Sequence, residues 1–408
     1  NAAAVTTLKG TTSEIETAYT ANSAGTITGL GDENIFISNI GTIASSQITS
    51  LDEATTGTVT LSGAGSLTLT TIAGETLNLS GVTNSLSGTL TINDSAGDNT
   101  IVGTSANDTL TLSSGNDTIN LGAGDDTINV TNMSDLTSAD IITDTSGIDT
   151  LNINGSGTIA SSNFNVSGFE YLNLSTGADV VTFTDKSSFD TFKSKFSSAI
   201  DTKGGDDEFK FSSAITEDLD FTKIANLEKL SFSESDDTVT FGADEFNAGI
   251  KTLDLGNGQN KAYLNADTTS SVQVNGGSGN DEFVLDFSRI TEKDYQLNGV
   301  SGSDTVKVTG SYNLGADIDF ADSNSFANID RIDLSSMVLT GDDSNEFKFN
   351  GSLVNSWNNN NSTGGTISLK LSADQTQNIG YTDYAGTYHD SVTAGNSYSL
   401  QDGATLTI

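Results

Sequence analysis

The 408-residue chain has no cysteine and no proline, and it has one histidine and one tryptophan. Without cysteine there can be no disulfide framework, no thiol nucleophile, no iron–sulfur cluster and no zinc site built on thiolates. The single histidine, His389, leaves no multi-histidine transition-metal site within one chain. These absences exclude thiol chemistry and the usual transition-metal sites.

Positive charge is scarce as well. The chain carries 16 lysines and arginines against 54 acidic residues, so its formal net charge is −38. A protein that neutralises phosphates needs clustered lysine and arginine, and the only arginines here are Arg289 and Arg331. The longest apolar run, residues 2–5, is far shorter than the roughly 20 residues that cross a bilayer. The sequence therefore predicts neither a nucleic-acid partner nor a transmembrane segment.

Small and polar residues are abundant instead. The chain has 42 glycines, and its threonine, serine and asparagine residues alternate with valine, isoleucine, leucine and phenylalanine. This composition is typical of short strands joined by tight turns, so we expect a folded, all-β protein of about two to three domains. The chain has neither an initiator methionine nor a signal peptide, which predicts a matured product or a piece of a longer protein.

Residues 97–130 contain a repeat of nine residues. Each copy has a turn of small residues, then an acidic or amide residue, then a large aliphatic residue two places later. The acidic position is held by Asn99, Asp108, Asp117 and Asp126, and the aliphatic position by Ile101, Leu110, Ile119 and Ile128. Four coincident copies indicate a repeat architecture in which each copy is one turn and one short strand.

The spacing predicts what each part of the repeat does. An aliphatic residue flanked by polar ones fits a strand of about three residues with one buried side chain, and glycine permits the chain to reverse. Stacked copies bring one carboxylate per repeat into line, where the charges repel one another. A hard divalent cation removes that repulsion, because Ca²⁺ accepts about 6–8 oxygen ligands from carboxylates and backbone carbonyls. We therefore expect calcium binding and folding to be coupled.

This pattern resembles the calcium-binding nonapeptide of repeats-in-toxin (RTX) proteins, whose consensus is G-G-x-G-x-D-x-U-x with U a large aliphatic residue. Residues 276–284 are a further copy close to this consensus. The resemblance implies a parallel β-roll in which turn carbonyls and the sixth-position aspartate bind calcium. The predicted metal-site residues are Asp98, Asn107, Asp108, Asn116, Asp117, Gly122, Gly124, Asp125 and Asp126 in the clear block, and Asp206, Asp207, Gly277, Gly279, Asn280, Asp281 and Asp304 in the later copies. The alternative is a structural solenoid whose polar turns bind no metal.

The predicted fold is an all-β parallel β-roll or β-solenoid with calcium-binding turns, flanked by β-rich modules and containing few short helices. Its predicted parts are an N-terminal β-rich assembly or anchoring module over residues 1–92, the calcium-binding solenoid over residues 93–310, and a C-terminal β-rich module over residues 311–408. Short helices are expected over residues 12–19 and 44–54. A further helix is expected over residues 187–200, where phenylalanines form a stripe at helical spacing.

Catalytic residues do not stand out in this sequence. Carboxylate pairs, which glycoside hydrolysis needs, occur throughout so acidic a chain and single out no site. No phosphate-binding loop is present, and no G-x-S-x-G motif accompanies His389. The one aromatic cluster that could line a cleft consists of Trp357, Tyr381, Tyr384, Tyr388 and His389. We interpret it as cross-strand aromatic pairs on a sheet surface and predict that the protein is not an enzyme.

The composition and the repeats together are similar to those of surface-layer proteins of Gram-negative bacteria. That resemblance implies type I secretion, a location on the bacterial cell surface, self-assembly into a lattice, and attachment to lipopolysaccharide. The predicted function is a structural subunit of a calcium-dependent extracellular assembly, either a surface layer or a filament, with calcium as cofactor. The alternatives are a secreted adhesin or biofilm-matrix protein that binds glycans or surfaces, and a secreted hydrolase whose repeats serve only export.

Overall fold

The computed structural model consists mainly of short parallel strands and divides into two compact units. Unit 1 contains Asn1–Val181 and Ser188–Gly205, and unit 2 contains Thr182–Ser187 and Asp206–Ile408. The structure describes residues 5–268, 270–288, 295–313, 318–319, 325–340, 347–349, 366–370, 379–382, 388–389, 397–399 and 405–407.

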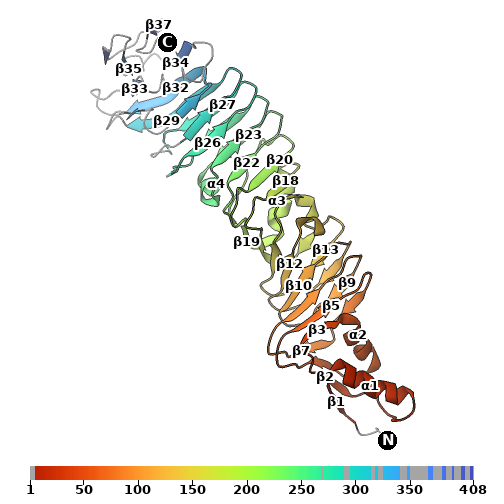
Figure 1. Ribbon diagram of the computed structural model, residues 1–408. Coiled ribbons are helices and arrows are strands. Elements are labelled where there is room, and N and C mark those ends of the chain that lie inside the picture. The colour runs from red at the N-terminus through yellow and green to blue at the C-terminus, as the bar shows by residue number, and fades with distance from the viewer. Residues whose placement is uncertain are drawn as a thin grey trace. The chain divides into compact units, whose positions relative to one another are not determined.

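Unit 1 is a parallel roll in which successive strands alternate between two sheets (Figure 1). Within unit 1, the first sheet contains β3 (Gly41–Ala44), β5 (Leu67–Thr70), β8 (Leu90–Asn93), β10 (Asp108–Leu112), β12 (Thr127–Val130), β14 (Thr150–Ile153), β17 (Phe169–Asn173) and β19 (Phe196–Asp201), paired in this order. Those of the second are β6 (Thr76–Asn78), β9 (Thr100–Val102), β11 (Thr118–Asn120), β13 (Ile141–Thr143) and β16 (Val166–Ser167). A third sheet at the N-terminal end contains β1 (Thr7–Gly10), β2 (Asn34–Ile37), β4 (Val59–Leu61) and β7 (Val82–Asn84). β15 (Thr158–Ala160) completes the strands that lie wholly in this unit.

The core of unit 1 is a column of aliphatic side chains, one from each rung. In-register parallel pairing places each of them directly above the next. The column consists of Leu69, Ile92, Leu110, Ile128, Leu151, Leu172 and Ile200, each at most 1% exposed. Each rung therefore buries its apolar side chain mainly against its neighbours, and stability is shared along the stack.

Two nonapeptides make one complete turn of the roll. Asp108 and Asp126, on adjacent strands of the same sheet, are 18 residues apart. The next rung is longer, because Asp126 and Asp149 are 23 residues apart. The extra residues include the short 3-10 helix η1 (Met133–Asp135). The predicted solenoid with rungs of different length is thus confirmed, and the all-β parallel roll with it.

Two helices lie near the N-terminus, as predicted. α1 spans Thr12–Ser23 and α2 spans Ser45–Ala54. The α1 helix begins with a capping box, in which the Thr11 hydroxyl accepts from the Glu14 N–H and the Glu14 carboxylate accepts from the Thr11 N–H at 2.8 Å. None of the helices in the described part of the chain is long and apolar enough to cross a membrane.

The helix predicted over residues 187–200 is only partly correct. α3 spans Lys186–Ser194, and residues 196–201 form β19 instead. Pairing with β17 gives this segment sheet hydrogen bonds, and it buries Phe196 and Ile200 as well as a helix would. The Phe196 ring also packs edge to face against Phe164 and Phe192. Apolar spacing alone could not separate the two structures.

Unit 2 repeats the same architecture with bulkier side chains. One sheet pairs β20 (Glu208–Phe211), β22 (Lys229–Ser231), β24 (Thr252–Asp254), β26 (Val272–Asn275), β28 (Tyr295–Asn298) and β31 (Ser325–Ala327). A second pairs β23 (Thr238–Phe241), β25 (Lys261–Leu264), β27 (Glu282–Asp286), β29 (Thr305–Asn313), β32 (Arg331–Thr340), β34 (Thr366–Lys370), β38 (Thr405–Thr407) and β37 (Ser397–Ser399). A third pairs β30 (Ile318–Asp319), β33 (Phe347–Phe349), β35 (Ile379–Thr382) and β36 (Tyr388–His389). The unit also contains β21 (Ile224–Ala225) and the helix α4 (Ala243–Ala248), which was not predicted.

The division into two units differs from the three predicted parts. β8 ends at Asn93 and pairs with both β5 and β10, so the expected boundary after residue 92 lies inside one continuous sheet. Within the described residues, the helices and strands before this point extend the roll. β18 (Val180–Phe183) and α3 each contain residues of both units.

Candidate metal centre

An acidic or amide residue lies just before or at the start of many strands of the roll. In each case the backbone N–H of this residue donates to the side-chain oxygen of its counterpart in the next rung. We call these rows the inner ladder. Its members are Asn99, Asp117 and Asp140 in one row of unit 1, Asp108, Asp126, Asp149 and Glu170 in the other, and Asp237, Asn260, Asp281, Asp304 and Asp330 in unit 2. The ladder bonds place one side chain of each rung above the next.

The inner ladder has short, well-formed hydrogen bonds. The Asp108 N–H lies 2.6 Å from Asp126 Oδ1, and the Asp126 N–H lies 2.8 Å from Asp149 Oδ1. In unit 2 the Asp281 N–H lies 2.8 Å from Asp304 Oδ1. Because each N–H belongs to the rigid roll, it fixes one oxygen of the next carboxylate and thereby fixes the direction of the other.

The second carboxylate oxygen is left without a partner. It is buried and accepts no hydrogen bond from any described residue in Asp117, Asp126, Asp149, Asp281 and Asp304. These side chains are at most 1% exposed. An unsatisfied buried oxygen is costly, and a buried unpaired charge more so. Buried carboxylate oxygens without a hydrogen-bond donor are the ligands that a hard cation such as Ca²⁺ takes.

Burial also changes the acidity of these groups. Desolvation raises the pKa of Asp117 and Asp281 to about 6 and that of Asp304 to about 7, although the ladder hydrogen bonds lower it in part. Neighbouring carboxylates raise the pKa of Asp117 and Asp304 further. Without a cation, these acids therefore ionise only at about pH 6–7, well above the ordinary range of an aspartate.

Glycines allow the turns of neighbouring rungs to stack closely. Gly124 has φ 122° and Gly279 has φ 140°, which side-chain-bearing residues rarely adopt. A Cβ atom on Gly279 would lie 1.6 Å from the carbonyl oxygen of Gly258 in the preceding rung. The predicted turn residues Gly122 and Gly277 also have positive φ. The backbone of one turn thus lies directly against the carbonyl groups of the next.

Asn260 shows what the gap between two turns requires. Its backbone N–H and its Oδ1 take part in the inner ladder like those of an aspartate. Its Nδ2 donates to the carbonyl oxygens of Gly256 and Gly276, at 3.3 and 3.1 Å. Turn carbonyls therefore point into the gap. The N–H groups of the amide offer them the positive charge that a bound cation would otherwise offer. Asn99 does the same, because its Nδ2 donates to the Ser95 carbonyl at 2.8 Å.

The structure separates the predicted metal-site residues into two groups. Asp108, Asp117, Asp126, Asp281 and Asp304 lie in the inner ladder. Buried Asp207 makes the same kind of contact, because its N–H donates to Glu228 Oε2 at 3.2 Å. The clear block lies in unit 1 and the later copies lie in unit 2.

The remaining predicted residues lie on the surface of the turns. Asp98, Asn107, Asn116, Asp125, Asp206 and Asn280 are exposed. Four of them accept a backbone N–H of the next rung through their side chains: Asp98 from Asn116, Asn107 from Asp125, Asp125 from Ile148 and Asn280 from Ser303. This outer ladder runs opposite to the inner one in its donor direction. Its side chains link successive turns at the surface.

Sequence reasoning missed several inner-ladder members, among them Asp140, Asp149 and Asn260. A strict nine-residue period could not find them, because their rungs are 21 or 23 residues long. A local signal was present, since each is followed two residues later by a buried apolar residue. For Asp149 that residue is Leu151, which follows it at the same spacing as Ile128 follows Asp126.

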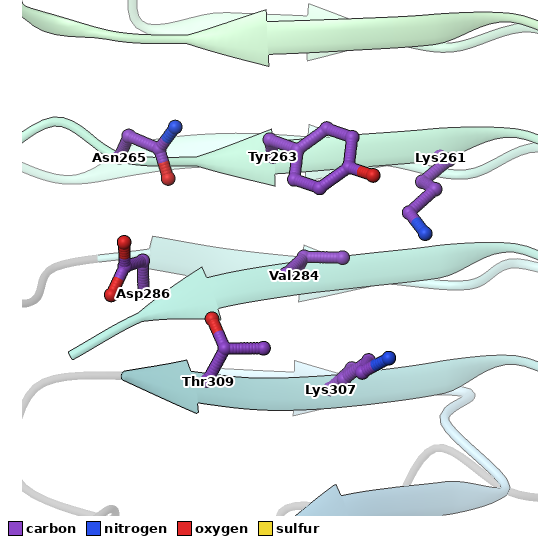
Figure 2. A pocket seen from close by; sticks show the side chains of 7 residues that line it. All are labelled: Lys261, Tyr263, Asn265, Val284, Asp286, Lys307 and Thr309. Atoms are coloured by element: carbon purple, nitrogen blue, oxygen red, sulfur yellow. The ribbon is translucent and has the colours of Figure 1, made fainter. Parts of the chain in front are cut away.

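A groove of a different character crosses the outer face of the β25–β27–β29 sheet in unit 2. It has a volume of about 300 Å³ and is lined by Lys261, Tyr263, Asn265, Val284, Asp286, Lys307 and Thr309. Figure 2 shows the two lysines toward one end of the strands and Asn265 with Asp286 toward the other. Lys261 Nζ lies 2.6 Å from Glu282 Oε1 and 5.0 Å from the centre of the Tyr263 ring. The groove combines an aromatic face with positive charge on an acidic protein.

A comparison with known families assigns part of the roll. The sequence model of the RTX calcium-binding nonapeptide repeat matches residues 94–128 in four copies. These repeats bind calcium, and they are typical of secreted proteins. The match includes Asp108, Asp117 and Asp126 of the inner ladder. No curated protein and no solved structure significantly matches the chain.

The raised pKa values predict that the stability of the calcium-free protein falls as the pH rises. The folded-state pKa of Asp117, Asp281 and Asp304 is about 6 to 7, above the ordinary value of 3.8. Between these values the folded state binds more protons than the unfolded state, so stability falls as pH rises. We expect the chelator-dialysed protein to melt at least ~5 °C higher at pH 5 than at pH 8, since each kcal/mol shifts the Tm by ~2–4 °C.

Calcium should reverse this trend, because bound metal requires ionised ligands. Thermal melting followed by circular dichroism at both pH values, with and without calcium, tests the reversal. A calcium-free protein that gains stability from pH 5 to pH 8 would contradict the role of the buried carboxylates.

Asn260→Asp should create a calcium site. The variant replaces an amide that bridges two carbonyls by a carboxylate with no donor on its second oxygen. In chelator it should lose about 1–3 kcal/mol of stability, the cost of a buried unsatisfied polar group. In calcium it should recover that loss and bind more ions than the parent, as measured by native mass spectrometry. Asn280→Asp is the matched control, because the same change lies on the exposed outer ladder. Equal losses for Asn260→Asp in both media would contradict the interpretation of the gap as a cation site.

Proposed function

We propose that the protein is a structural subunit of a calcium-dependent assembly outside a bacterial cell. The observation that carries this proposal is the cation-free stretch of the chain. Between Lys9 and Lys186 the sequence has no lysine and no arginine, yet this stretch contains the buried carboxylates of unit 1. Among the described residues no lysine or arginine forms an ion pair with Asp117, Asp126 or Asp149, so a charge from solution is needed to neutralise them, and the RTX repeats of this stretch bind calcium.

This requirement couples folding to location. At the low calcium concentration of a cytosol, the stacked carboxylates repel one another and the folded roll is destabilised. At the roughly millimolar calcium of many extracellular media, even sites of modest affinity fill and the roll closes. The chain can thus be exported unfolded and fold outside. Secretion through a type I system agrees with this order of events and belongs to the proposal.

Two features of unit 1 favour association between copies. β1 pairs on one side only, with β2, within the described residues, so its other edge can accept a further strand. Large aliphatic side chains also project from a surface of small polar residues, since Ile40, Ile72, Ile141 and Ile148 are 48–65% exposed. Neither feature is needed by an isolated roll. We propose a lattice or filament that is built through such contacts and serves no catalytic purpose.

Calcium addition to the metal-free protein tests this proposal. We expect a gain of β-sheet circular dichroism together with ordered sheets or fibres in negative-stain microscopy when calcium is raised to a few millimolar. Magnesium at the same concentration is the control, because it requires smaller, octahedral sites and dehydrates reluctantly. Folding to a stable monomer, as judged by light scattering, would refute the assembly but leave calcium-driven folding in place. No response to calcium would refute both.

The second candidate is an adhesin that binds an anionic glycan, and the groove of Figure 2 favours it. Tyr263 offers an aromatic face, Lys261 and Lys307 offer positive charge, and Asn265 with Asp286 can hydrogen-bond hydroxyl groups. This combination suits a saccharide that carries phosphate or carboxylate groups, as lipopolysaccharide does. The Lys261–Glu282 ion pair holds one of the lysines in place beside the ring.

A panel of charged and neutral bacterial polysaccharides tests the groove. We expect Tyr263→Ala with Lys307→Gln to weaken binding of the anionic members by about tenfold or more, the loss of ~1.4 kcal/mol or more. Lys251→Gln is the control, because Lys251 is exposed outside the groove and pairs only loosely with Glu228 at 3.7 Å. Equal binding by all three proteins, or no binding by the parent, would contradict the adhesin.

The third hypothesis, a hydrolase, depends on the aromatic cluster around His389. Trp357 and Tyr384 of this cluster lie outside the described residues. The backbones of Tyr381 and His389 pair in antiparallel strands.

A further inference from the structure

Three aspartates meet where the 18-residue rungs give way to a 23-residue rung. Asp126 belongs to the last nonapeptide and Asp149 to the following rung of the same inner ladder. Asp144 begins the turn that leads to Asp149 and lies five residues before it, at the position where the RTX consensus has its first glycine. Neither Asp144 nor Asp149 is within the residues that the RTX repeat model matches. The turn therefore departs from the repeat by adding a carboxylate.

These three carboxylates converge on one buried space. One oxygen of each lies within 4.8 Å of the others. Asp126 is 1% exposed, Asp149 is fully buried and Asp144 is 9% exposed. In all three the Oδ2 atom is buried and accepts no hydrogen bond from any described residue. The three carboxylates therefore lie together, each has one buried oxygen without a partner, and no other group of three acidic residues in the described part of the chain comes this close.

The backbone holds each carboxylate by its other oxygen. Asp126 Oδ1 accepts the Asp108 N–H at 2.6 Å, and Asp149 Oδ1 accepts the Asp126 N–H at 2.8 Å. Asp144 Oδ1 accepts the N–H of Thr145 at 2.6 Å. Because one oxygen is fixed in each case, the unpartnered Oδ2 atoms are preorganised rather than free to turn toward solvent.

The protein supplies no positive charge to this cluster. Among the described residues no lysine or arginine forms an ion pair with Asp126, Asp144 or Asp149, and the nearest cations in the sequence are Lys9 and Lys186. No amide bridges the gap either, in contrast to the turn of Asn260. One turn carbonyl is already engaged, since the Gly122 oxygen accepts the N–H and the hydroxyl of Thr145. The carboxylate of Asp144 offers a cation an oxygen ligand in place of this carbonyl oxygen.

We propose that Asp126, Asp144 and Asp149 bind one calcium ion through their Oδ2 atoms, in a three-carboxylate site distinct from the nonapeptide sites. The chemistry fits a hard divalent cation, since all three ligands are carboxylate oxygens, which carry three negative charges when all are ionised. Ca²⁺ suits the gap better than Mg²⁺ because it accepts a flexible set of about 6–8 ligands. The ion joins the last nonapeptide rung to the first longer rung, so it closes the RTX block at its C-terminal end. This inference deepens the proposed calcium dependence and rests on it.

Asp144→Asn tests the site, because it removes one ligand charge and leaves a side chain of the same size. Its amide can donate to the unpartnered Oδ2 of Asp126 or Asp149. We therefore expect one bound calcium ion to be lost, or its affinity to fall by about tenfold or more, by native mass spectrometry and calorimetric titration. We also expect a lower melting temperature than the parent in calcium and an equal or higher one in chelator.

Glu53→Gln is the matched control, since it removes the same charge from an exposed position on α2 in the same cation-free stretch. It should leave calcium number and affinity unchanged. If Asp144→Asn binds as many ions with the same affinity as the parent, this site is refuted while calcium binding by the repeats stands. If Asp144→Asn melts lower than the parent equally in both media, its role is structural and the site is refuted too. If the parent itself binds no calcium, the proposed function fails first.

Discussion

Repulsion between stacked carboxylates is the constraint on which this structure depends. Parallel strands about 4.8 Å apart repeat every side chain at nearly that distance, so one acid per rung becomes a row of like charges. The aliphatic column beside it, from Leu69 to Ile200, favours the stack, and the row opposes it. The roll forms only if the row is neutralised without being removed. The backbone N–H groups of the inner ladder contribute to this, but each satisfies only one oxygen of each carboxylate.

The carboxylate oxygen that the ladder N–H groups leave unsatisfied is accommodated in three ways. In the rung of Asn260, an amide replaces both the acid and its counter-charge, and donates to two turn carbonyls. In the nonapeptide rungs, pairs of aspartates leave oxygens that the RTX calcium ions neutralise. At Asp144, an additional carboxylate takes the place of a glycine. These rungs share the inner-ladder hydrogen bond, so the way in which each is neutralised depends on single side chains.

The fold class was predictable because the repeat of residues 97–130 is strict. Its period links each acid to one aliphatic residue, and both Ile119 and Ile128 are indeed buried in the stack. Rung length was not predictable, since turns can take in extra residues such as η1 without disturbing the pairing of Ile128 with Leu151. For the same reason Asp149 escaped notice. The prediction of a helix over residues 187–200 was wrong from Phe196 onward, because this segment pairs with the strand β17 instead. A local sequence pattern does not show such a distant pairing partner.

The distribution of lysine separates the two units in their dependence on solution cations. In unit 2, lysines pair with acids along the strands: Lys229 with Glu208 at 3.3 Å and Lys261 with Glu282 at 2.6 Å. These exposed pairs stabilise little individually, but they lower the net charge that calcium must offset. From residue 10 to residue 185 the chain has no such cations, and its buried acids include both nonapeptide rows and the Asp144 cluster. In the function proposed above, calcium is therefore a structural component of unit 1 as its aliphatic column is, and the stretch without lysine is the part whose folding depends on the ion.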